Sequence, residues 1–515
     1  MAKKTFMQGA VILAAAGVII KALGAVFRIP LGNMISDEGM GYYQTAYVIY
    51  VMFLVLSNTG MPVAISRVVS ERLAVSDREG AHRVFRVSFL LVSAIGLASF
   101  LFCFFQSEFL LGFFPNMENA SYSIRAISPA LLIVPVMASF RGYFQGMQNM
   151  RPTANSQIVE QLFRVAVGLS LAFFLLPKGE QFAAAGAAFG ATAGAAFGLA
   201  AIALIYYFSR GRLRAARRAA GRRGRAGADS TRRTLFRILA IAVPITIGAS
   251  IMPIMNFIDL ALITNRLSDM GWAPDDVRGA YGQLTGFANP LINLPQILTQ
   301  SVAMSLVPAV AGAYKRGDTE FLRHNIRLGL RTSLVIGLPC ALGIMTLSTQ
   351  IMEMFFPAEK EAADSAASFL FILAFGIIFL SAVQTLTGVL QGVGRQMTPV
   401  RNLFVGAAVK VAVTWVLIAV PSINVKGAAI GTVTAYFVAA ALNLAAVRRH
   451  TGTSFEIGKT FVKPAVAALV MSLVAGGSYR LFSLLLGGAP AAFATALAVV
   501  AGVIVYAAMI FVSGA

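Results

Sequence analysis

Long apolar runs alternate with short polar connections from one end of the chain to the other. A helix that crosses a bilayer needs about 20 mostly apolar residues, and windows of that kind recur along the whole sequence. They begin near Phe6, Gly41, Val84, Ser123, Asn155, Ala183, Leu235, Gly282, Asn325, Ser365, Val400, Val425, Val462 and Ala491. The pattern predicts an all-α polytopic membrane protein with about 14 transmembrane helices.

A diverged second copy of one helix-loop-helix segment indicates an internal duplication. Residues 141–165 read RGYFQGMQNMRPTANSQIVEQLFRV, and residues 387–411 read TGVLQGVGRQMTPVRNLFVGAAVKV. Each copy has a Gln-Gly pair before a basic loop, and each carries one cation, Arg164 or Lys410, in the apolar helix that follows. The duplication predicts two six-helix lobes, and the two remaining helices are appended to the second lobe.

The repeats divide the sequence into four predicted segments. The N-terminal lobe covers residues 1–208, the C-terminal lobe covers residues 235–450, and the two extra helices occupy residues 451–515. Between the lobes, residues 209–234 hold ten Arg among Ala and Gly. A nucleic-acid-binding tail is one interpretation of that run, but a linker held at the anionic membrane surface is favoured because the run lies between two spans.

Composition and charge agree with a membrane protein. Of 515 residues, 58% are hydrophobic and 12% are charged, with a formal net charge of +21 and a mean hydropathy of +0.76. Most of the 42 Lys and Arg fall in alternate connections, while acids such as Asp37, Asp275 and Glu359 fall in the opposite ones. Because cytoplasmic loops carry the excess of Lys and Arg, both termini are expected in the cytoplasm and nucleic acid is not an expected partner.

Four glycines spaced by four residues follow the first copy of the repeat. They are Gly186, Gly190, Gly194 and Gly198, and the second copy answers with Gly427 and Gly431. Residues spaced by four share a helix face, and glycine lets a second helix approach closely. This face is predicted to be a packing seam.

Enzymatic and metal chemistry find no support in the sequence. There is no phosphate-binding loop, the three His fall in cytoplasmic connections, and Cys103 and Cys340 lie in different halves, so no disulfide is expected. A membrane glycosyltransferase is a weaker alternative, since no outer connection is long enough to fold alone. We expect a non-enzyme without metal or cofactor, driven by the membrane potential or an ion gradient, and a monomer.

Six ionisable residues fall inside apolar segments, where a charge must face a protein interior or water. They are Lys21, Arg28, Glu160, Arg164, Asp259 and Lys410. Glu160 and Arg164 stand four residues apart on one helix face, so a purely structural ion pair and a functional role are about equally supported. The cations predict a site for an anionic substrate, lined by Lys21, Arg28, Arg164 and Lys410, with Glu160 and Asp259 serving a gate or coupling.

A group of amide side chains marks a second polar region. Gln283, Asn289, Asn293, Gln296 and Gln300 share the seventh and eighth segments with several prolines. Proline inside a span is tolerated where neighbours or water satisfy the freed backbone groups. Bent helices beside a polar cavity lining are therefore predicted here.

The repeat motif, the run Gly60-Met-Pro62 and the stretch Asn293-Leu-Pro295 together resemble the lipid flippases of the MurJ and stage V sporulation protein B group. That group belongs to the multidrug, oligosaccharidyl-lipid and polysaccharide exporter superfamily. The resemblance covers essentially the whole chain. One departure is that helices two and eight, which carry cavity arginines in Gram-negative MurJ, have none here in residues 41–66 and 281–313.

The resemblance implies two six-helix lobes related by a pseudo-two-fold axis, with the two extra helices bounding a groove for a lipid tail. It also implies alternating access that carries lipid II, an undecaprenyl-pyrophosphate-linked precursor, across the bacterial cell membrane, with Lys21 and Arg28 at the places of cavity-lining residues. Export of another lipid-linked polysaccharide unit and cation-coupled drug antiport are the alternatives.

Overall fold

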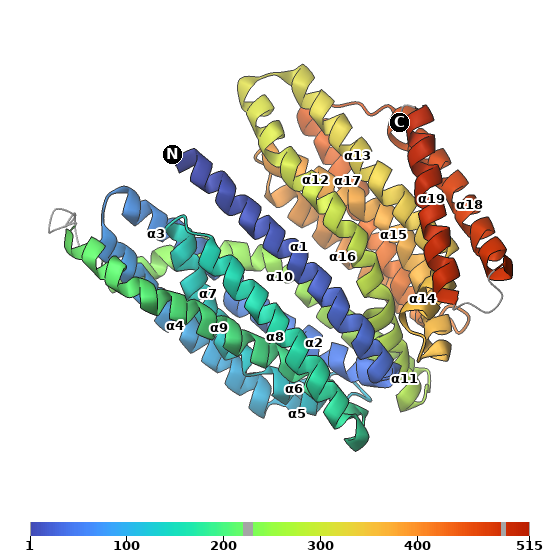
Figure 1. The fold of residues 1–515 in the computed structure, drawn as a ribbon, viewed down its shortest axis with the longest axis horizontal. Helices are drawn as coiled ribbons and strands as arrows, with labels where there is room; N and C mark the ends of the chain where they lie inside the picture. Colours follow the sequence, from blue (N-terminus) through green and yellow to red (C-terminus); the bar gives the residue numbers. More distant parts are fainter. Residues whose placement is uncertain (1, 220–229, 486–490, 514–515) are drawn as a thin grey trace. The chain divides into compact units, whose positions relative to one another are not determined.

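The computed structural model describes residues 2–219, 230–485 and 491–513, without the side chains of residues 2–15, 18, 21, 210, 212–219 and 513. Regular structure in these ranges is helical throughout (Figure 1). The helices of the first half are α1 (Ala2–Met34), α2 (Asp37–Asn58), α3 (Gly60–Ala74), α4 (Arg78–Phe105), α5 (Ser107–Leu111), α6 (Ala120–Ile127), α7 (Ala130–Gly146), α8 (Arg151–Leu175), η1 (Leu176–Lys178), α9 (Glu180–Ala219) and α10 (Thr231–Asp269). Those of the second half are α11 (Pro274–Gly282), η3 (Gln283–Ala288), α12 (Asn289–Arg316), α13 (Thr319–Thr346), α14 (Ser348–Phe355), α15 (Lys360–Gly392), α16 (Met397–Ile418), α17 (Lys426–Thr451), η4 (Gly458–Val462), α18 (Lys463–Leu485) and α19 (Ala491–Ser513).

The described part of the chain contains 13 helical segments long and apolar enough to cross a membrane. Each coincides with one of the predicted windows from Gly41 onward, which confirms the all-α polytopic class. The remaining window, near Phe6, falls on α1, where residues 2–15 are described only as backbone. Of the predicted linker, residues 209–219 continue α9 and residues 220–229 lie outside the described residues.

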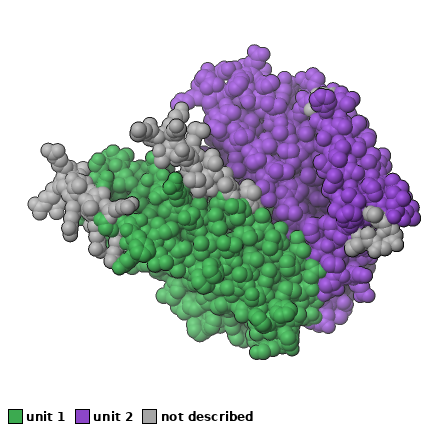
Figure 2. All heavy atoms as spheres, viewed as in Figure 1, with its two compact units in different colours: residues 1–261 green, residues 262–515 purple. Residues whose placement is uncertain are grey.

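Two compact units make up the chain, unit 1 of residues 1–261 and unit 2 of residues 262–515 (Figure 2). The division falls inside α10, so that residues 231–261 pack with unit 1. The segment boundaries were predicted from the sequence repeat, whereas this division follows the packing of the helices. Those boundaries stay a prediction.

The first part of α10 is tied to α3 within unit 1. The backbone N–H of Gly60 donates to Thr246 Oγ1 at 3.2 Å, and Arg237 pairs with Glu71 at 2.6 Å. A β-carbon at residue 60 would collide with the carbonyl oxygen of Ala242. Glycine is therefore what allows α10 to lie against the start of α3.

The predicted glycine seam joins α8 and α9 in unit 1. A β-carbon added at Gly190 would lie 2.6 Å from the carbonyl oxygen of Arg164, and one added at Gly198 would lie 2.9 Å from Cβ of Glu160. At Gly194 an added carbon would meet the carbonyl oxygen of Glu160. The backbones of the two helices are thus in direct contact, and the seam prediction is confirmed.

The same arrangement recurs between α16 and α17 in unit 2. A β-carbon at Gly431 would lie 3.2 Å from the carbonyl oxygen of Lys410, just as Gly190 faces that of Arg164. Gly406, which stands at the position equivalent to Glu160, approaches the carbonyl oxygen of Ala435. The duplication read from the sequence is therefore visible at the level of single backbone contacts.

Helix geometry changes just before α12, as the prolines of this region predict. The segment η3 is a π-helix, and it is followed by the pair Asn289-Pro290. Proline has no N–H to complete the bond to the residue four positions earlier, so a wider turn is a natural local solution. α12 itself contains Pro295 and Pro308.

The two appended helices, α18 and α19, pack against each other and against α13 and α14. Ala475 and Ala498 form a small buried cluster with Leu347 of the segment joining α13 to α14, and the Tyr506 hydroxyl donates to the Val335 carbonyl at 2.7 Å. Their outer faces expose large apolar side chains, among them Leu484 and Phe511. Such a surface suits contact with lipid tails. The predicted lipid-tail groove stays a prediction.

Candidate functional site

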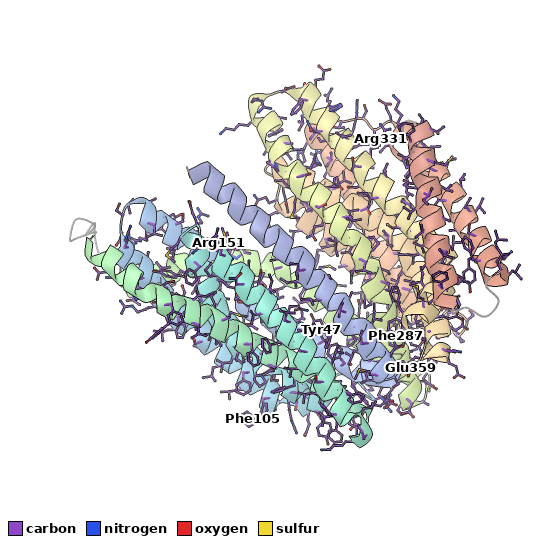
Figure 3. All side chains as sticks on the ribbon, in the orientation of Figure 1. Tyr47, Phe105, Arg151, Phe287, Arg331 and Glu359 are labelled. Carbon is purple, nitrogen blue, oxygen red and sulfur yellow. The ribbon has the colours of Figure 1, made fainter. Side chains whose placement is uncertain are left out.

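The first group of interest surrounds Arg164, where α8 passes α1 and α2 within unit 1. Its guanidinium carbon lies 5.2 Å from the ring centroid of Tyr47 and 6.0 Å from that of Phe27. One guanidinium N–H donates to the Tyr43 hydroxyl at 3.4 Å. Tyr43 and Tyr47 are four residues apart, so they share one face of α2 and stack on each other. Figure 3 labels Tyr47 beside these helices.

Arg28, from α1, reaches the same ring. Its guanidinium carbon lies 5.7 Å from the Tyr47 centroid, so Tyr47 contacts two cations. Neither Arg28 nor Arg164 has a carboxylate within ion-pair distance among the residues that the structure describes. An aromatic face attracts a cation without neutralising it, by about 0.5–2 kcal/mol. The two positive charges are thereby held in place without being neutralised.

Glu160 has a different partner from the predicted one. Arg141, on α7, donates through Nη2 to Glu160 Oε2 at 2.8 Å and through Nε to Ser156 Oγ at 2.9 Å. Of the two alternatives for Glu160 and Arg164, the structural ion pair between them is therefore not formed. The reason is that the guanidinium fork of Arg141 crosses from the neighbouring helix and satisfies both Ser156 and Glu160. A coupling role for Glu160 stays a prediction.

Lys410 lies half-buried on α16, in unit 2. Amide side chains link α15, α16 and α17 where the Arg141–Glu160 pair links helices in unit 1. Asn402 donates to Asn443 at 2.9 Å, and Asn443 donates to Thr387 at 3.4 Å. Thr387 and Asn402 are the repeat equivalents of Arg141 and Ser156. The duplicated positions thus keep an interhelical polar link while its charge is removed.

The other predicted charged residues are described to different extents. The side chain of Lys21 lies outside the described residues. Asp259 is half-buried on α10, and its role in a gate or coupling stays a prediction, as does a cavity shared by Lys21, Arg28, Arg164 and Lys410. What the structure does bring together is Arg28 and Arg164, around Tyr47.

The predicted amide residues lie on η3 and α12, in unit 2. Gln296 donates to Asn293 Oδ1 at 2.9 Å, and Gln384 of α15 donates to Gln296 Oε1 at 3.5 Å. Thr299, which is 1% exposed, donates to Gln384 Oε1 at 2.6 Å. Asn293 and Gln300 are exposed, whereas Gln283 and Asn289 are half-buried. These contacts define an amide cluster of Asn293, Gln296, Thr299 and Gln384.

Several residues of these sites were not among the predicted ones. Tyr43, Tyr47 and Gln384 belong here, and so does Arg266, whose guanidinium carbon lies 4.1 Å from the Trp415 ring centroid in unit 2. Arg266 lies beyond the apolar window that starts near Leu235, whereas α10 continues to Asp269. The spacing of the α2 tyrosines is a signal that the sequence did contain.

No group of three or more His, Cys, Asp or Glu that could hold a metal ion occurs among the described residues.

Comparison with known proteins places this architecture in a family. The model of the polysaccharide biosynthesis protein family matches residues 6–313, and the MatE model matches residues 284–416. The chain is also 30% identical over 483 residues to the membrane protein YabM of Bacillus subtilis (strain 168), covering 93% of this chain and 86% of that protein. The chain belongs to the polysaccharide biosynthesis protein family.

Members of the family and solved structures with the same fold extend the comparison. Stage V sporulation protein B of B. subtilis is 27% identical, over 89% of this chain and 86% of that protein, and the lipid II flippase MurJ of the same organism is 27% identical, over 93% and 89%. A solved structure of lipid II flippase MurJ in an inward closed conformation matches with a TM-score of 0.70 at 16% identity, over 97% of this chain and 98% of that one. An inward-facing MATE multidrug transporter also gives 0.70, at 14% identity, over 84% and 94%. The structural matches show a shared fold.

Proposed function

We propose that this family member is a flippase that carries a lipid-linked, pyrophosphate-bearing glycan precursor across the bacterial cytoplasmic membrane by alternating access. Lipid II is the candidate substrate. The observation that supports the proposal best is the pair of guanidinium groups, Arg28 and Arg164, held by the Tyr47 ring and without a carboxylate partner in the described part of the chain. A relative named as a lipid II flippase supports the same class of substrate.

The charge of the site decides between substrates of opposite sign. Arginine presents a planar fork of donors that matches phosphate oxygens. A guanidinium inside a span is costly when left in lipid, so two of them without a carboxylate indicate a site that receives negative charge. A cationic drug would be repelled there, and the drug-antiporter alternative is disfavoured for that reason.

A flippase for another lipid-linked polysaccharide unit remains the second candidate. The family description refers to polysaccharide biosynthesis in general. A pair of arginines that binds the pyrophosphate does not distinguish between the sugars attached to it. In either case the protein moves its substrate and does not change it chemically, with both termini in the cytoplasm.

The test is complementation in a host whose own lipid II flippase can be depleted. We expect the chain to sustain wall synthesis and growth, and the Arg28→Gln and Arg164→Gln variants to fail although they reach the membrane. The matched control is Arg232→Gln, which removes an arginine over Phe236 at the exposed start of α10 and should retain rescue.

Two results would contradict the proposal. If the unchanged chain inserts and does not rescue, the substrate is not lipid II. If both arginine variants rescue as well as the control does, the guanidinium pair does not bind the substrate.

A further inference from the structure

The amide cluster of unit 2 offers hydrogen-bonding groups of a kind that the Arg28–Arg164 site does not. In its buried part, Thr299 Oγ1 donates to Gln384 Oε1 at 2.6 Å, and Thr299 is 1% exposed. In its exposed part, Gln296 donates to Asn293 at 2.9 Å, and Asn293 is exposed. The buried Thr299 hydroxyl therefore orients Gln384. From there, hydrogen bonds between neutral side chains extend to Asn293 on the surface of a membrane-spanning helix.

An exposed amide in that position requires water or a polar ligand. Asn293, Gln296 and Thr299 lie within the candidate span Pro274–Arg316 and Gln384 within Lys360–Gly392, and Asn293, Gln300 and Ser301 are exposed along the first. Lipid tails cannot hydrogen-bond to an amide, so a side chain of this kind facing them would lose free energy. This face of α12 is accordingly one that solvent or a polar substrate can reach.

Helix packing alone does not require these amides, as the internal repeat shows. Gly388 and Gly392 of α15 lie against Ala303 and Val310 of α12, and in unit 1 the glycines Gly142 and Gly146 of α7 lie against α3 in the same way. The offsets that these contacts set put Ala138 of α7 at the place of Gln384 and Val55 of α2 at the place of Gln296. The counterparts in unit 1 thus pack without the amides.

The chemistry of the cluster identifies the kind of group that it can bind. Each amide carries two N–H donors and an oxygen acceptor, and the contacts within the cluster use only part of that capacity. There is no charge among Asn293, Gln296, Thr299 and Gln384, so the cluster has little preference for a phosphate. Donors and acceptors side by side, partly fixed by one another, suit the hydroxyl and N-acetyl groups of a sugar.

We infer that the amide cluster is a glycan subsite, which binds a sugar of the lipid-linked substrate. The inference rests on the proposed function, because it names the part of that substrate that the cluster binds. Gln384 and Thr299 are positioning residues, and Asn293 and Gln296 contact the sugar.

The test compares two ligands that differ only in the sugar. Purified protein in lipid nanodiscs is titrated with undecaprenyl pyrophosphate and with undecaprenyl-pyrophosphoryl-N-acetylglucosamine, and bound ligand is measured by native mass spectrometry. The variants are Gln296→Met and Gln384→Met, which keep side-chain length and remove the amide. The control is Ser305→Ala, on an exposed part of α12 where the hydroxyl bonds only to the Val302 carbonyl.

We expect the unchanged protein to bind the sugar-bearing ligand about tenfold more tightly than the bare pyrophosphate, as one or two net hydrogen bonds allow. Both Met variants should lose that preference and keep their affinity for undecaprenyl pyrophosphate, which also shows that they are folded. Ser305→Ala should behave as the unchanged protein.

The possible failures separate the two ideas. If the unchanged protein binds both ligands equally, or if the Met variants keep the preference, the glycan subsite is wrong and the flippase proposal stands. If the unchanged protein binds neither ligand, the proposed function itself fails, and the subsite fails with it.

Discussion

A single side chain, Arg164, shows how this protein keeps a charge inside a membrane span. A nearby carboxylate would neutralise it, but Glu160 is already engaged by Arg141 and Ser156. Three aromatic residues surround the guanidinium instead, two through their ring faces and Tyr43 through its hydroxyl. Because quadrupolar attraction stabilises the cation without an opposing charge, Arg164 keeps its ability to attract an anion.

Tyr47 is the residue on which both arginines depend, and this gives the first prediction. Tyr47→Ala removes the ring face from Arg28 and Arg164 and should weaken binding of undecaprenyl pyrophosphate about 5- to 30-fold, as two contacts of about 0.5–1 kcal/mol imply. Tyr47→Phe keeps the ring and should change binding less than threefold. Equilibrium titration in nanodiscs measures both, and equal losses in the two variants would show that the ring face is not what matters.

The Arg141–Glu160 pair gives the second prediction, which concerns stability. The two side chains retain 13% and 25% of their exposure, so either Arg141→Met or Glu160→Met leaves a mostly buried charge without its partner. Each should lower the free energy of unfolding by about 2–3 kcal/mol, and the double variant by less than the sum of the two. Denaturant unfolding in detergent gives the values.

An exposed pair provides the control for that measurement. Arg67 lies 3.2 Å from Glu71 but is 64% exposed, and Glu71 keeps Arg237 as a second partner. Arg67→Met should therefore change stability by less than about 0.5 kcal/mol. A loss as large as that of Arg141→Met, or strict additivity in the double variant, would contradict a specific role for the Arg141–Glu160 pair.

At the scale of single residues, the sequence predicted features that lie within one helix. It did not predict contacts between residues that are far apart in the chain. The cations Arg164 and Lys410 stood out because a charge inside an apolar helix is visible locally. The partner of Glu160 did not, since Arg141 reaches it only through the crossing of α7 and α8. Gln384 was missed for the same reason: it lies 88 residues from Gln296 and belongs to a helix that reads as ordinary apolar core.

At the scale of helices, spacing by four residues predicted the α8–α9 contact correctly. The glycines of α9 allow backbone contact with Glu160 and Arg164, so the seam also determines where these two side chains of the candidate site lie. The prolines of α12 predicted bent helices, which stays a prediction, and the π-helical form of η3 was not predicted, because several backbone geometries can accommodate a missing N–H.

The seam gives the third prediction. In Gly194→Ala the new carbon would overlap the carbonyl oxygen of Glu160, and separating the backbones should cost about 1–3 kcal/mol of unfolding free energy. The control is Gly248→Ala on α10, where nothing lies within 4 Å of the added carbon and alanine favours the helix. Thermal unfolding of the two variants should differ by several degrees, and a stable Gly194→Ala variant would contradict close packing at the seam.

At the scale of the whole chain, the two repeats share a mode of helix packing but differ in the polar and charged side chains that they carry. Both seams have the close contact of a glycine with a backbone carbonyl, Gly190 with Arg164 and Gly431 with Lys410. The Arg141–Glu160 pair of unit 1, however, is replaced in unit 2 by Thr387, Asn402 and Asn443. Unit 1 carries the two arginines around Tyr47, and unit 2 carries the amide cluster. The sequence shows the duplication itself, but not which polar contacts each repeat has formed, because those contacts join residues far apart in the chain.

The last prediction concerns the driving force for transport. No phosphate-binding loop is found in the sequence, and the proposed substrate carries a negatively charged pyrophosphate. Each negative charge that moves outward across an inside-negative membrane gains about 2.3 kcal/mol per 100 mV. The arginines must then return without the substrate, so part of that gain is used when the positive site moves back. We therefore expect net outward flipping to depend on the membrane potential and not on nucleotide.

Sealed proteoliposomes with a potassium gradient and valinomycin test this directly. Net flipping of a pyrophosphate-linked lipid should rise with an inside-negative potential and stop when the potential is collapsed, with or without ATP. A sugar-free neutral lipid in the same vesicles controls for leakage. Arg164→Gln should remove the potential-dependent flux while the vesicles hold their gradient, because the charge that receives the pyrophosphate is gone. Flipping that continues unchanged at zero potential would mean that another gradient drives the protein, and a requirement for ATP would contradict the mechanism altogether.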